Sequence, residues 1–260
     1  MKKKALKKDF IIEVKKSLNR YISILLIVAL GVAFFSGIRA TETDMQISGD
    51  TYFDRTGFMD IRVISTMGLT DNDLSAIEDL KDVNTVEPVK SLDVLSTTKD
   101  SESVFKLFSK TDIINKIKII EGRLPKANDE CLIDSLFALN GGYIVGDTIT
   151  FCSGNETKLE ENLAHTQYTI VGIGDSPLYL SYKRGNSSIG NGSVDYFAVL
   201  PKEEFRAEVY SEIYITVENT TPLNSYSKEY EERVEKVLKS IEGIAGTQTQ
   251  IRYEEVLSEP

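Results

Sequence analysis

The longest apolar run of the chain lies near its N-terminus. Residues 21–38 carry no charged side chain and are flanked by Arg20 and Arg39. At about 1.5 Å per residue, a helix of this length spans about 27 Å, close to the thickness of the hydrocarbon core of a bilayer. The pattern predicts a transmembrane helix over residues 21–38. A cleavable signal peptide and a buried core helix are the two alternatives.

The flanks of this run favour an uncleaved membrane helix. The basic region before it is about twenty residues long, and the run exceeds the usual 7–15 residues of a signal core. The sequence Ile38-Arg39-Ala40 places a bulky residue and a charge where a signal peptidase needs small side chains. A buried core helix rarely follows a polybasic stretch.

The first twenty residues have a helical pattern of their own. Apolar side chains recur every four residues, at Leu6, Phe10, Val14 and Leu18, and lysines occupy the other faces. This spacing predicts a basic amphipathic helix over residues 1–20, lying at an anionic inner leaflet or against a partner at the membrane surface. A basic flank that only sets topology is the alternative.

Beyond the apolar run, short segments alternate in polarity or are rich in β-branched residues. They predict strands at 58–64, 83–86, 89–95, 103–108, 116–120, 130–133, 145–151, 168–173, 194–200 and 212–217. Pro88 stands between two of these strands and predicts an edge or a bulge there. Residues 184–193, rich in glycine, asparagine and serine, predict a flexible surface loop.

Helices are fewer in this part of the chain. Residues 40–54 are polar and without proline, so we expect them to continue the membrane helix outward to Gly57. Thr70 to Asp73 resembles a capping box before an apolar helix. A short helix reaches Leu139, and the last helix, residues 230–241, is expected to end at Gly243. Strands mixed with a few helices, without regular βαβ alternation, predict an α+β fold rather than a doubly wound sheet.

These patterns divide the chain into four predicted parts. They are a cytoplasmic basic amphipathic helix (1–20), a transmembrane helix (21–38), a stalk (39–56) and an extracytoplasmic domain (57–260).

Charge agrees with this division. Residues 1–39 carry nine basic and two acidic side chains, a net charge of +7. Because the whole chain has a net charge of −10, residues 40–260 have a net charge of −17. Positive charge gathers on the cytoplasmic side of a membrane helix, so residues 1–20 are predicted to be cytoplasmic and residues 40–260 extracellular, at the cell membrane. An acidic body lacks the basic surface that phosphate contacts need, which argues against nucleic acid as a partner.

Candidate catalytic chemistry is sparse. His165 is the only histidine, and it lies in a polar stretch where a surface position is expected. No phosphate-binding loop, nucleophile elbow, HExxH or EF-hand pattern occurs. The adjacent carboxylates Glu203-Glu204 and Glu231-Glu232 are interpreted as solvated faces. We therefore predict no enzyme activity and no catalytic, cofactor-binding or metal-binding residue.

The two cysteines leave two interpretations open. Cys131 and Cys152 have no CxxC spacing. In an exported domain they could form one disulfide, and two separate thiols are the alternative.

The order of several short motifs resembles the FtsX-like, MacB-type permeases of ABC transporters. Glu121 to Pro125 (EGRLP), followed by residues 129–133, is similar to an EGRxP segment of the extracytoplasmic core domain in that family. Residues 146–150, 168–173 and 195–201 resemble successive strand segments of the same domain. Together with the basic head and the single membrane helix, the likeness extends over essentially the whole chain.

This resemblance implies a non-enzymatic permease component of a type VII ABC transporter. Its partners would be a separate ATPase subunit, a second permease copy, the lipid membrane, and an extracytoplasmic peptide or protein. ATP-driven motion would pass through residues 21–38 to the outer domain, for export or for resistance to antimicrobial peptides. The EGRLP turn would be structural, with Gly122 and Pro125 setting the backbone and Arg123 pairing with a carboxylate such as Glu130.

One departure from the family concerns the membrane helices. Members carry three more of them after the outer domain, whereas the last residues before Pro260 are polar. The resemblance therefore implies a truncated permease. Two further interpretations stay open. One is a complete, single-pass anchored binding or sensor domain, and the other is an anchored hydrolase that depends on His165.

Overall fold

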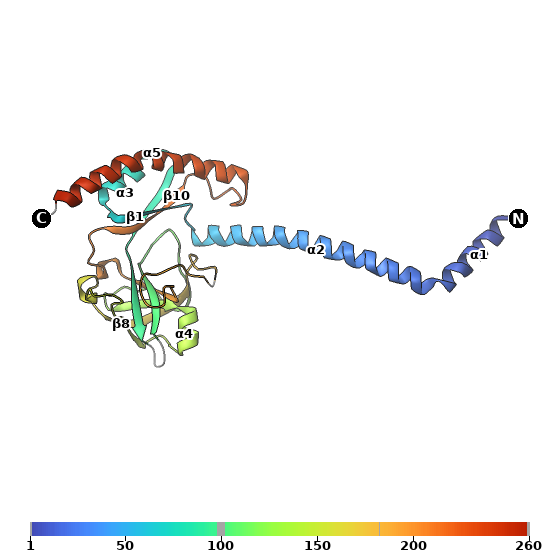
Figure 1. The fold of residues 1–260 in the computed structure, drawn as a ribbon, viewed down its shortest axis with the longest axis horizontal. Coiled ribbons are helices and arrows are strands. Elements are labelled where there is room, and N and C mark those ends of the chain that lie inside the picture. Colours follow the sequence, from blue (N-terminus) through green and yellow to red (C-terminus); the bar gives the residue numbers. More distant parts are fainter. Residues whose placement is uncertain (1, 98–101, 182, 259–260) are drawn as a thin grey trace. The chain divides into compact units, whose positions relative to one another are not determined.

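The computed structural model describes residues 2–97, 102–181 and 183–258. It divides the chain into two compact units, which meet between Asp50 and Thr51. Each unit is described by itself. The predicted mixture of strands and helices is confirmed, because one long apolar N-terminal helix precedes a mixed α+β domain (Figure 1).

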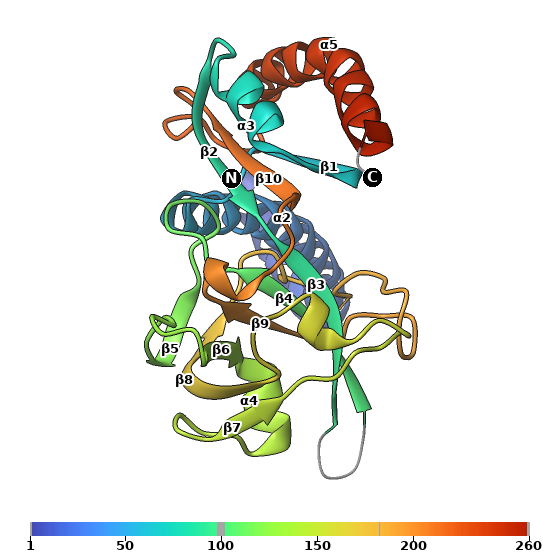
Figure 2. The same ribbon diagram turned by 90° about the vertical axis from the view of Figure 1, so that its left-hand side faces the viewer.

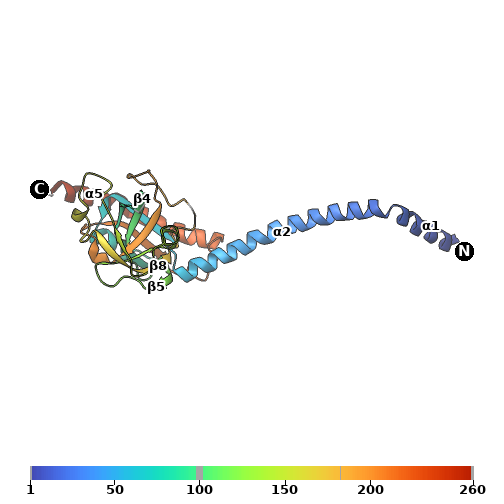
Figure 3. The ribbon, with the colours of Figure 1, turned by 90° about the horizontal axis from the view of Figure 1, so that it is seen from below.

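The first unit is helical throughout its described residues. Helix α1 covers Lys2–Lys16, and helix α2 begins at Leu18 after a single break at Ser17 (Figure 3). The predicted amphipathic helix over residues 1–20 therefore ends four residues earlier than expected, and Leu18 belongs to the next helix. Ser17 ends one helix and starts the other, because its amide donates to the carbonyl of Glu13 while its own carbonyl accepts from Arg20.

Helix α2 covers Leu18–Thr56. It is the one helix, among the described residues, that is long and apolar enough to cross a membrane, and its apolar stretch is not buried in the protein. The helix continues through residues 40–54 and ends before Gly57, as predicted. The outer unit includes the end of this helix from Thr51 to Thr56, and Thr56 is buried.

The outer unit is built on two sheets (Figure 2). Its strands are β1 (Ile61–Leu69), β2 (Val83–Val89), β3 (Ser91–Thr97), β4 (Glu102–Ser109), β5 (Lys118–Gly122), β6 (Glu130–Asp134), β7 (Thr148–Thr150), β8 (Gln167–Asp175), β9 (Tyr196–Leu200) and β10 (Tyr210–Val217). Its helices are α3 (Asp71–Glu78), α4 (Ser135–Gly141) and α5 (Lys228–Ser258), with short 3-10 turns η1 (Leu159–Glu161) and η2 (Lys202–Glu204).

The small sheet has the strand order β1-β10-β2, with both pairings antiparallel. Strands β1 and β2 are thus parallel to each other on either side of β10, and α3 joins them in a split βαβ arrangement. Helices α3 and α5 cover one face, where Ile77, Val237 and Ile241 pack against Ile213 and Ile215. The carboxylate of Asp73 accepts a 2.8 Å hydrogen bond from the Thr70 amide, so the predicted capping box is confirmed.

The large sheet has the order β3-β4-β9-β6-β8-β5, and β7 pairs with β8. Parallel pairings (β4 with β9, β6 with β8) alternate with antiparallel ones, which is why the sequence shows no regular βαβ rhythm. Its core contains a group of packed aromatic rings, in which Phe105 contacts Phe137 at 4.7 Å and Phe151 at 5.4 Å between ring centroids.

The two sheets meet at a third apolar cluster. Val89 and Tyr214 come from the small sheet, and Phe108, Phe197 and Val199 from the large one. The chain passes from one sheet to the other at Lys90. Pro88 does not interrupt its strand, because β2 is an edge strand and a proline there costs no ladder hydrogen bond on its free side.

Several predicted boundaries differ from those in the structure, among them the start of the first strand and the end of the last helix. The first strand begins at Ile61 and not at residue 58. The Asp60 carboxylate accepts a hydrogen bond from the Val217 amide, and the chain turns into the strand at this residue. The last helix does not end at Gly243 but continues to Ser258, since neither Gly243 nor Gly246 has the positive φ of a helix-ending glycine.

Candidate functional site

The end of helix α2 is fixed to the loop that follows strand β4. The Lys116 amide donates to the Thr56 carbonyl at 2.8 Å, and the Asn115 amide donates to the Gly57 carbonyl at 2.9 Å. The side-chain oxygen of Asn115 accepts from the Met59 amide at 3.1 Å. Gly57 has φ +59, and a Cβ there would lie 2.8 Å from the Ile113 carbonyl oxygen, so glycine suits this position.

A buried carboxylate holds the same loop against the small sheet. Glu87 of β2 is 7% exposed. It accepts hydrogen bonds from the backbone amides of Asp112, at 2.7 Å, and Ile114, at 2.6 Å, and from that of Ile113 between them. Successive amides that point at one carboxylate compensate for the loss of water around a buried charge. Residues 112–115 are therefore a fixed connection between the helix end and strand β2.

Asp60 makes the second connection. One of its carboxylate oxygens accepts from the Val217 amide at 2.6 Å and from the Thr220 hydroxyl at 3.2 Å. The other accepts from the Tyr230 hydroxyl at 2.5 Å. Because Val217 ends β10 and Tyr230 lies in the first turn of α5, this one side chain ties the entry of β1 to both elements.

We call residues 56–60, with Glu87 and Asn115, the helix–domain junction. Within four residues of the end of α2, the chain is already hydrogen-bonded to the loop after β4 and to β10. A groove of about 400 Å³ lies beside it, lined among others by Phe53, Met59, Lys116 and Tyr226. Within the outer unit, the helix end is therefore hydrogen-bonded to the loop between β4 and β5, and the residues that follow it are hydrogen-bonded to β10 of the small sheet.

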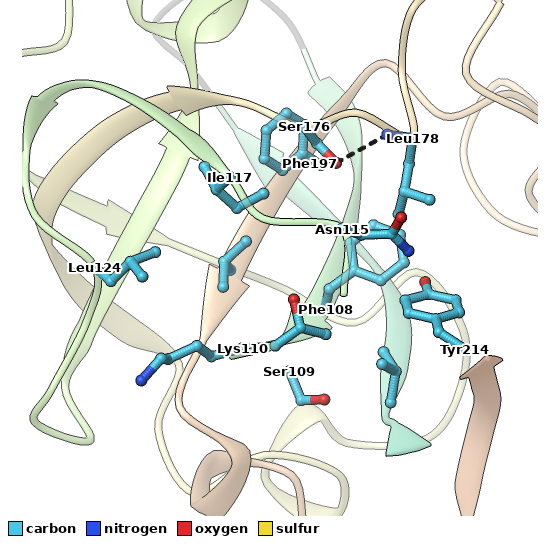
Figure 4. Close-up of a pocket in the computed structure, with 13 residues that line it drawn as sticks. Phe108, Ser109, Lys110, Asn115, Ile117, Leu124, Ser176, Leu178, Phe197 and Tyr214 are labelled. Atoms are coloured by element: carbon cyan, nitrogen blue, oxygen red, sulfur yellow. Dashed lines mark hydrogen bonds between the residues drawn. The ribbon is translucent and has the colours of Figure 1, made fainter. Parts of the chain in front are cut away.

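A small cavity lies between the two sheets next to this junction (Figure 4). Its volume of about 20 Å³ suits one water molecule. The side-chain amide nitrogen of Asn115 and the hydroxyl of Tyr214 are buried without a hydrogen-bond partner among the described residues, and both side chains line the cavity. Burial and the nearby Glu212 carboxylate raise the pKa of Tyr214 well above its ordinary value, so its hydroxyl stays a donor.

The EGRLP turn contains the ion pair that the resemblance implied. The Arg123 guanidinium donates two hydrogen bonds to Glu130, at 2.7 and 2.5 Å. Glu130 also accepts from the Lys126 amide at 2.8 Å and the Ala127 amide at 3.1 Å. The bond from Arg123, followed by the two amides, lowers the pKa of Glu130 from 4.5 to about 2.

Two glycines allow this turn to approach strand β8. Gly122 has φ +73, and a Cβ on it would lie 2.2 Å from the Val171 carbonyl oxygen. A Cβ on Gly172 would lie 2.2 Å from the Arg123 carbonyl oxygen. The Arg123 amide donates to the Val171 carbonyl at 2.9 Å, so two backbones touch where any side chain would separate them.

His165 does not lie alone on the surface. Its ring nitrogen Nδ1 is 3.0 and 3.1 Å from the two carboxylate oxygens of Glu204, and the Tyr168 hydroxyl donates to the same carboxylate at 2.8 Å. Glu204 is fully buried, so the interpretation of Glu203-Glu204 as a solvated pair is wrong for its second member. The side chain of His165 remains 49% exposed. The side chains of His165, Tyr168 and Glu204 thus hold the η2 turn against the start of β8.

Neither cysteine is in a disulfide. Cys131 is buried in β6, and Cys152 is exposed after β7. Burial raises the pKa of the Cys131 thiol far above its ordinary range. In the described part of the chain, no group of three or more histidine, cysteine, aspartate and glutamate side chains lies close enough to hold a metal ion.

Three residues that hold the junction were not predicted from the sequence. Glu87 was detectable, because a carboxylate between Val86 and Pro88 in a strand needs buried donors. Asn115, with φ +54, follows two isoleucines where a turn residue is unexpected. Asp60 carried no local signal, because its partners lie more than 150 residues further along the chain.

Comparison with known proteins gives a consistent family assignment. The sequence profile of the "MacB-like periplasmic core domain" matches residues 22–233. No curated protein matches the chain significantly.

Solved structures with a detectable likeness include three transporter domains. The extracellular domain of the noncanonic ABC-type transporter YknZ from Gram-positive bacteria has 12% identity and a TM-score of 0.39, with 69% of this chain and 87% of that chain covered. The periplasmic region of MacB from Actinobacillus actinomycetemcomitans has 12% identity and a TM-score of 0.39, with coverage of 70% and 76%. A domain of a putative permease protein from Porphyromonas gingivalis has 16% identity and a TM-score of 0.35, with coverage of 60% and 70%.

Proposed function

The chain belongs to the family of MacB-like periplasmic core domains, and on this premise we propose that it passes movement from a membrane helix to an outer domain. In a type VII ABC transporter permease, an ATPase on the cytoplasmic side drives such movement. The chain itself would carry out no chemistry. Its role would be to couple the apolar part of α2 to the two sheets.

The helix–domain junction is the observation that carries this proposal. Helix α2 continues from its apolar stretch to Thr56 without interruption. Its end is then held by Asn115 and Asp60 within a few residues. A flexible tether would satisfy the needs of an anchor. A helix whose end is hydrogen-bonded to the loop between β4 and β5, and through Asp60 to β10, suits the transmission of a push, a tilt or a rotation.

The partners follow from the two ends of α2. The basic residues of α1 suit an anionic inner leaflet and the surface of an ATPase subunit at the membrane. A second permease copy would complete the assembly. The domain bounds proposed are 1–20 cytoplasmic, 21–38 transmembrane, 39–56 stalk and 57–260 extracytoplasmic, with the N-terminus in the cytoplasm.

The physiological role would lie among export and resistance to antimicrobial peptides. In both, an outer domain works on an extracytoplasmic peptide or protein while ATP is consumed on the other side of the membrane. The acidic part of the chain after the apolar run suits a cationic peptide, because the charge of residues 40–260 is −17, the overall −10 less the +7 of residues 1–39.

The test is copurification from the native membrane. The tagged full chain, extracted in mild detergent, is expected to bring down an ABC ATPase whose ATP hydrolysis can be measured. Replacing Lys7, Lys8, Lys15 and Lys16 by glutamate should abolish the copurification, while Asp60→Ala should retain the ATPase and uncouple its stimulation by a cationic peptide. Replacing Lys228 and Lys239, two exposed lysines of α5, by glutamate is the control for a change in net charge away from α1.

A chain that brings down no ATPase, yet binds a peptide tightly by itself, would favour the anchored binding or sensor domain. The lysine and Asp60 variants address different steps, so that a failure to recruit the ATPase is distinguishable from a failure to transmit movement.

A further inference from the structure

Strand β5 forms one edge of the large sheet. Among the residues that the structure describes, it pairs with β8 alone, so its outer side has no strand neighbour (Figure 2). All residues of the strand, Lys118–Gly122, are exposed. An open edge offers backbone donors and acceptors to another strand, and natural proteins either protect such an edge or use it for binding. The edge of β5 is therefore a candidate interaction surface.

The side chains of this edge are two exposed isoleucines between opposite charges. Ile119 is 43% and Ile120 56% exposed, although apolar side chains of this size gain free energy on leaving water. Lys118 precedes them and Glu121 follows them, so residues 118–121 read Lys-Ile-Ile-Glu. Read in the opposite direction, the order of the charges is reversed. An antiparallel copy of the same segment therefore places lysine opposite glutamate and isoleucine opposite isoleucine.

A bulge in β5 brings the two charges to the same face of the sheet. Lys118 lies opposite Asp175 of β8. Glu121 lies opposite Ile173, two residues before Asp175, so the extra residue of the bulge falls between the two charges. Residues two apart on a strand share a face, and so do opposite residues of paired strands. Lys118 and Glu121 therefore share a face, which residues three apart in a regular strand do not.

This spacing selects a second copy of the chain over a regular strand. A regular strand carries charges of one face two or four residues apart, so it cannot match charges that are three apart. A second copy has the same bulge. Around a two-fold axis between Ile119 and Ile120, each Lys118 faces the Glu121 of the other copy, and the two bulges lie opposite each other. A contact of one surface with itself is the usual arrangement in two-fold symmetric dimers.

The surrounding charges leave room for this contact. The Nζ of Lys118 lies 3.7 Å from a carboxylate oxygen of Asp175, and the Lys118 side chain is still 57% exposed. An ammonium group has three donors, so it can bind a second carboxylate beside the first. The next basic residue along the chain, Arg123, is paired with Glu130 and does not compete for Glu121.

We propose that the β5 edges of two copies pair antiparallel about a two-fold axis between Ile119 and Ile120. The isoleucines of the two copies then cover one another, and a Lys118–Glu121 pair flanks them on each side. This inference rests on the second permease copy of the proposed function and names its contact surface. One short strand on each side buries less area than a stable interface in solution needs. The contact therefore forms between copies that the membrane already holds close together.

Disulfide formation between two differently tagged copies of the full chain, in native membranes, tests this contact. In a Cys152→Ser background, one copy carries Ile119→Cys and the other Ile120→Cys. Opposite positions on antiparallel strands are close enough for a disulfide, so we expect a linked pair that carries both tags. Ile144→Cys in both copies is the control, because this isoleucine is 62% exposed and lies outside β5, and it should give no linked pair.

Reversal of charge tests the proposed register. Added to both copies, Glu121→Lys places lysines opposite each other and should lower the yield of the disulfide about tenfold, and Lys118→Glu should do the same with glutamates. When one copy carries Lys118→Glu and the other Glu121→Lys, opposite charges face each other again and the yield should return. Glu208→Lys, a change at an exposed residue outside β5, should leave the yield unchanged.

The outcomes separate this proposal from the one on which it rests. Two tags that copurify without forming the disulfide would overturn the pairing of the β5 edges and leave the second permease copy in place. Tags that do not copurify at all would overturn both the pairing and the second copy. A disulfide whose yield does not respond to either reversal, or does not return in the mixed pair, would show that the two strands meet without the proposed register.

Discussion

At the scale of single residues, the most consequential side chain is Asp60. Replacing it by alanine removes the acceptor for the Val217 amide, the Thr220 hydroxyl and the Tyr230 hydroxyl at once. Because Val217 is buried, its amide would lose its partner away from water, and we expect Asp60→Ala to lower the free energy of unfolding by about 3 kcal/mol. Chemical denaturation of the outer unit measures this loss.

The variant Tyr230→Phe is the control for Asp60. It removes one donor and leaves the carboxylate with its other two, so a loss of about 1 kcal/mol is expected. Equal losses in the two variants would mean that Asp60 acts through Tyr230 alone.

Glu130 gives the chain a predictable response to acid. The pKa of this carboxyl is lowered from 4.5 to about 2 by Arg123 and two backbone amides. A carboxylate whose pKa is lower in the folded than in the unfolded chain stabilises the fold at pH values above the unfolded-state pKa. This contribution to the free energy of unfolding disappears as the pH falls from 4.5 toward 2. The stability difference between the native chain and Glu130→Gln should therefore be constant from pH 7 to pH 5 and shrink below it. Denaturation curves at several pH values measure this difference. A difference that stays constant below pH 5 would show that the Arg123–Glu130 pair does not stabilise the fold.

The neighbouring glutamates 203 and 204 form a matched pair for a further test. Glu204 is fully buried and accepts from Tyr168, whereas Glu203 is exposed. Glu204→Ala should cost about 2–3 kcal/mol, because a cavity and a weakened buried hydroxyl remain, and Glu203→Ala should cost less than about 0.5 kcal/mol. Thermal unfolding compares the two variants directly.

At the scale of elements, the EGRLP turn depends on backbone shape more than on charge. Gly122 and Gly142 both have positive φ, at +73 and +68, but only Gly122 lies against another backbone. Gly142→Ala should cost about 1–2 kcal/mol for the left-handed conformation alone. Gly122→Ala adds a clash with the Val171 carbonyl and should cost at least about 2 kcal/mol more. Similar unfolding temperatures in the two variants would show that strand β5 can move away.

The sequence predicted elements well where one local pattern decides them. The apolar run of α2 and the capping box before α3 both lie within short stretches of the chain, whereas the Arg123–Glu130 pair was implied by the family resemblance. It failed where distant partners decide. Glu204 looked solvated because its partners are at least 36 residues away, and Asp60 turned the start of β1 through a contact 157 residues further on.

Strand order was equally out of reach for the sequence. Alternation predicts that a segment is a strand, but not which neighbour it takes, so the transfer of the chain between sheets at Lys90 could not be foreseen. The end of α5 is the opposite case. There the local signal for a turn at Gly243 is strong, and the helix continues through it.

At the scale of the whole molecule, the proposed orientation in the membrane can be tested with the chain's own thiols. Cys152 is exposed on the outer unit, while Cys131 is buried and its pKa is raised by burial. A thiol reacts with maleimide only when it is accessible and partly ionised. In intact cells, a membrane-impermeant maleimide should therefore label the native chain at Cys152, and Cys152→Ser should remove the label.

A second cysteine makes the orientation unambiguous. Ser17 lies between α1 and α2, on the side of the apolar run opposite to the outer unit in the sequence. In the Cys152→Ser background, Ser17→Cys should stay unlabelled in intact cells and become labelled once the membrane is permeabilised. The reverse result would place the outer unit in the cytoplasm. In that orientation α1 would lie outside the cell, where it could not contact a cytoplasmic ATPase. The orientation of helix α2 therefore decides whether the chain can transmit movement outward.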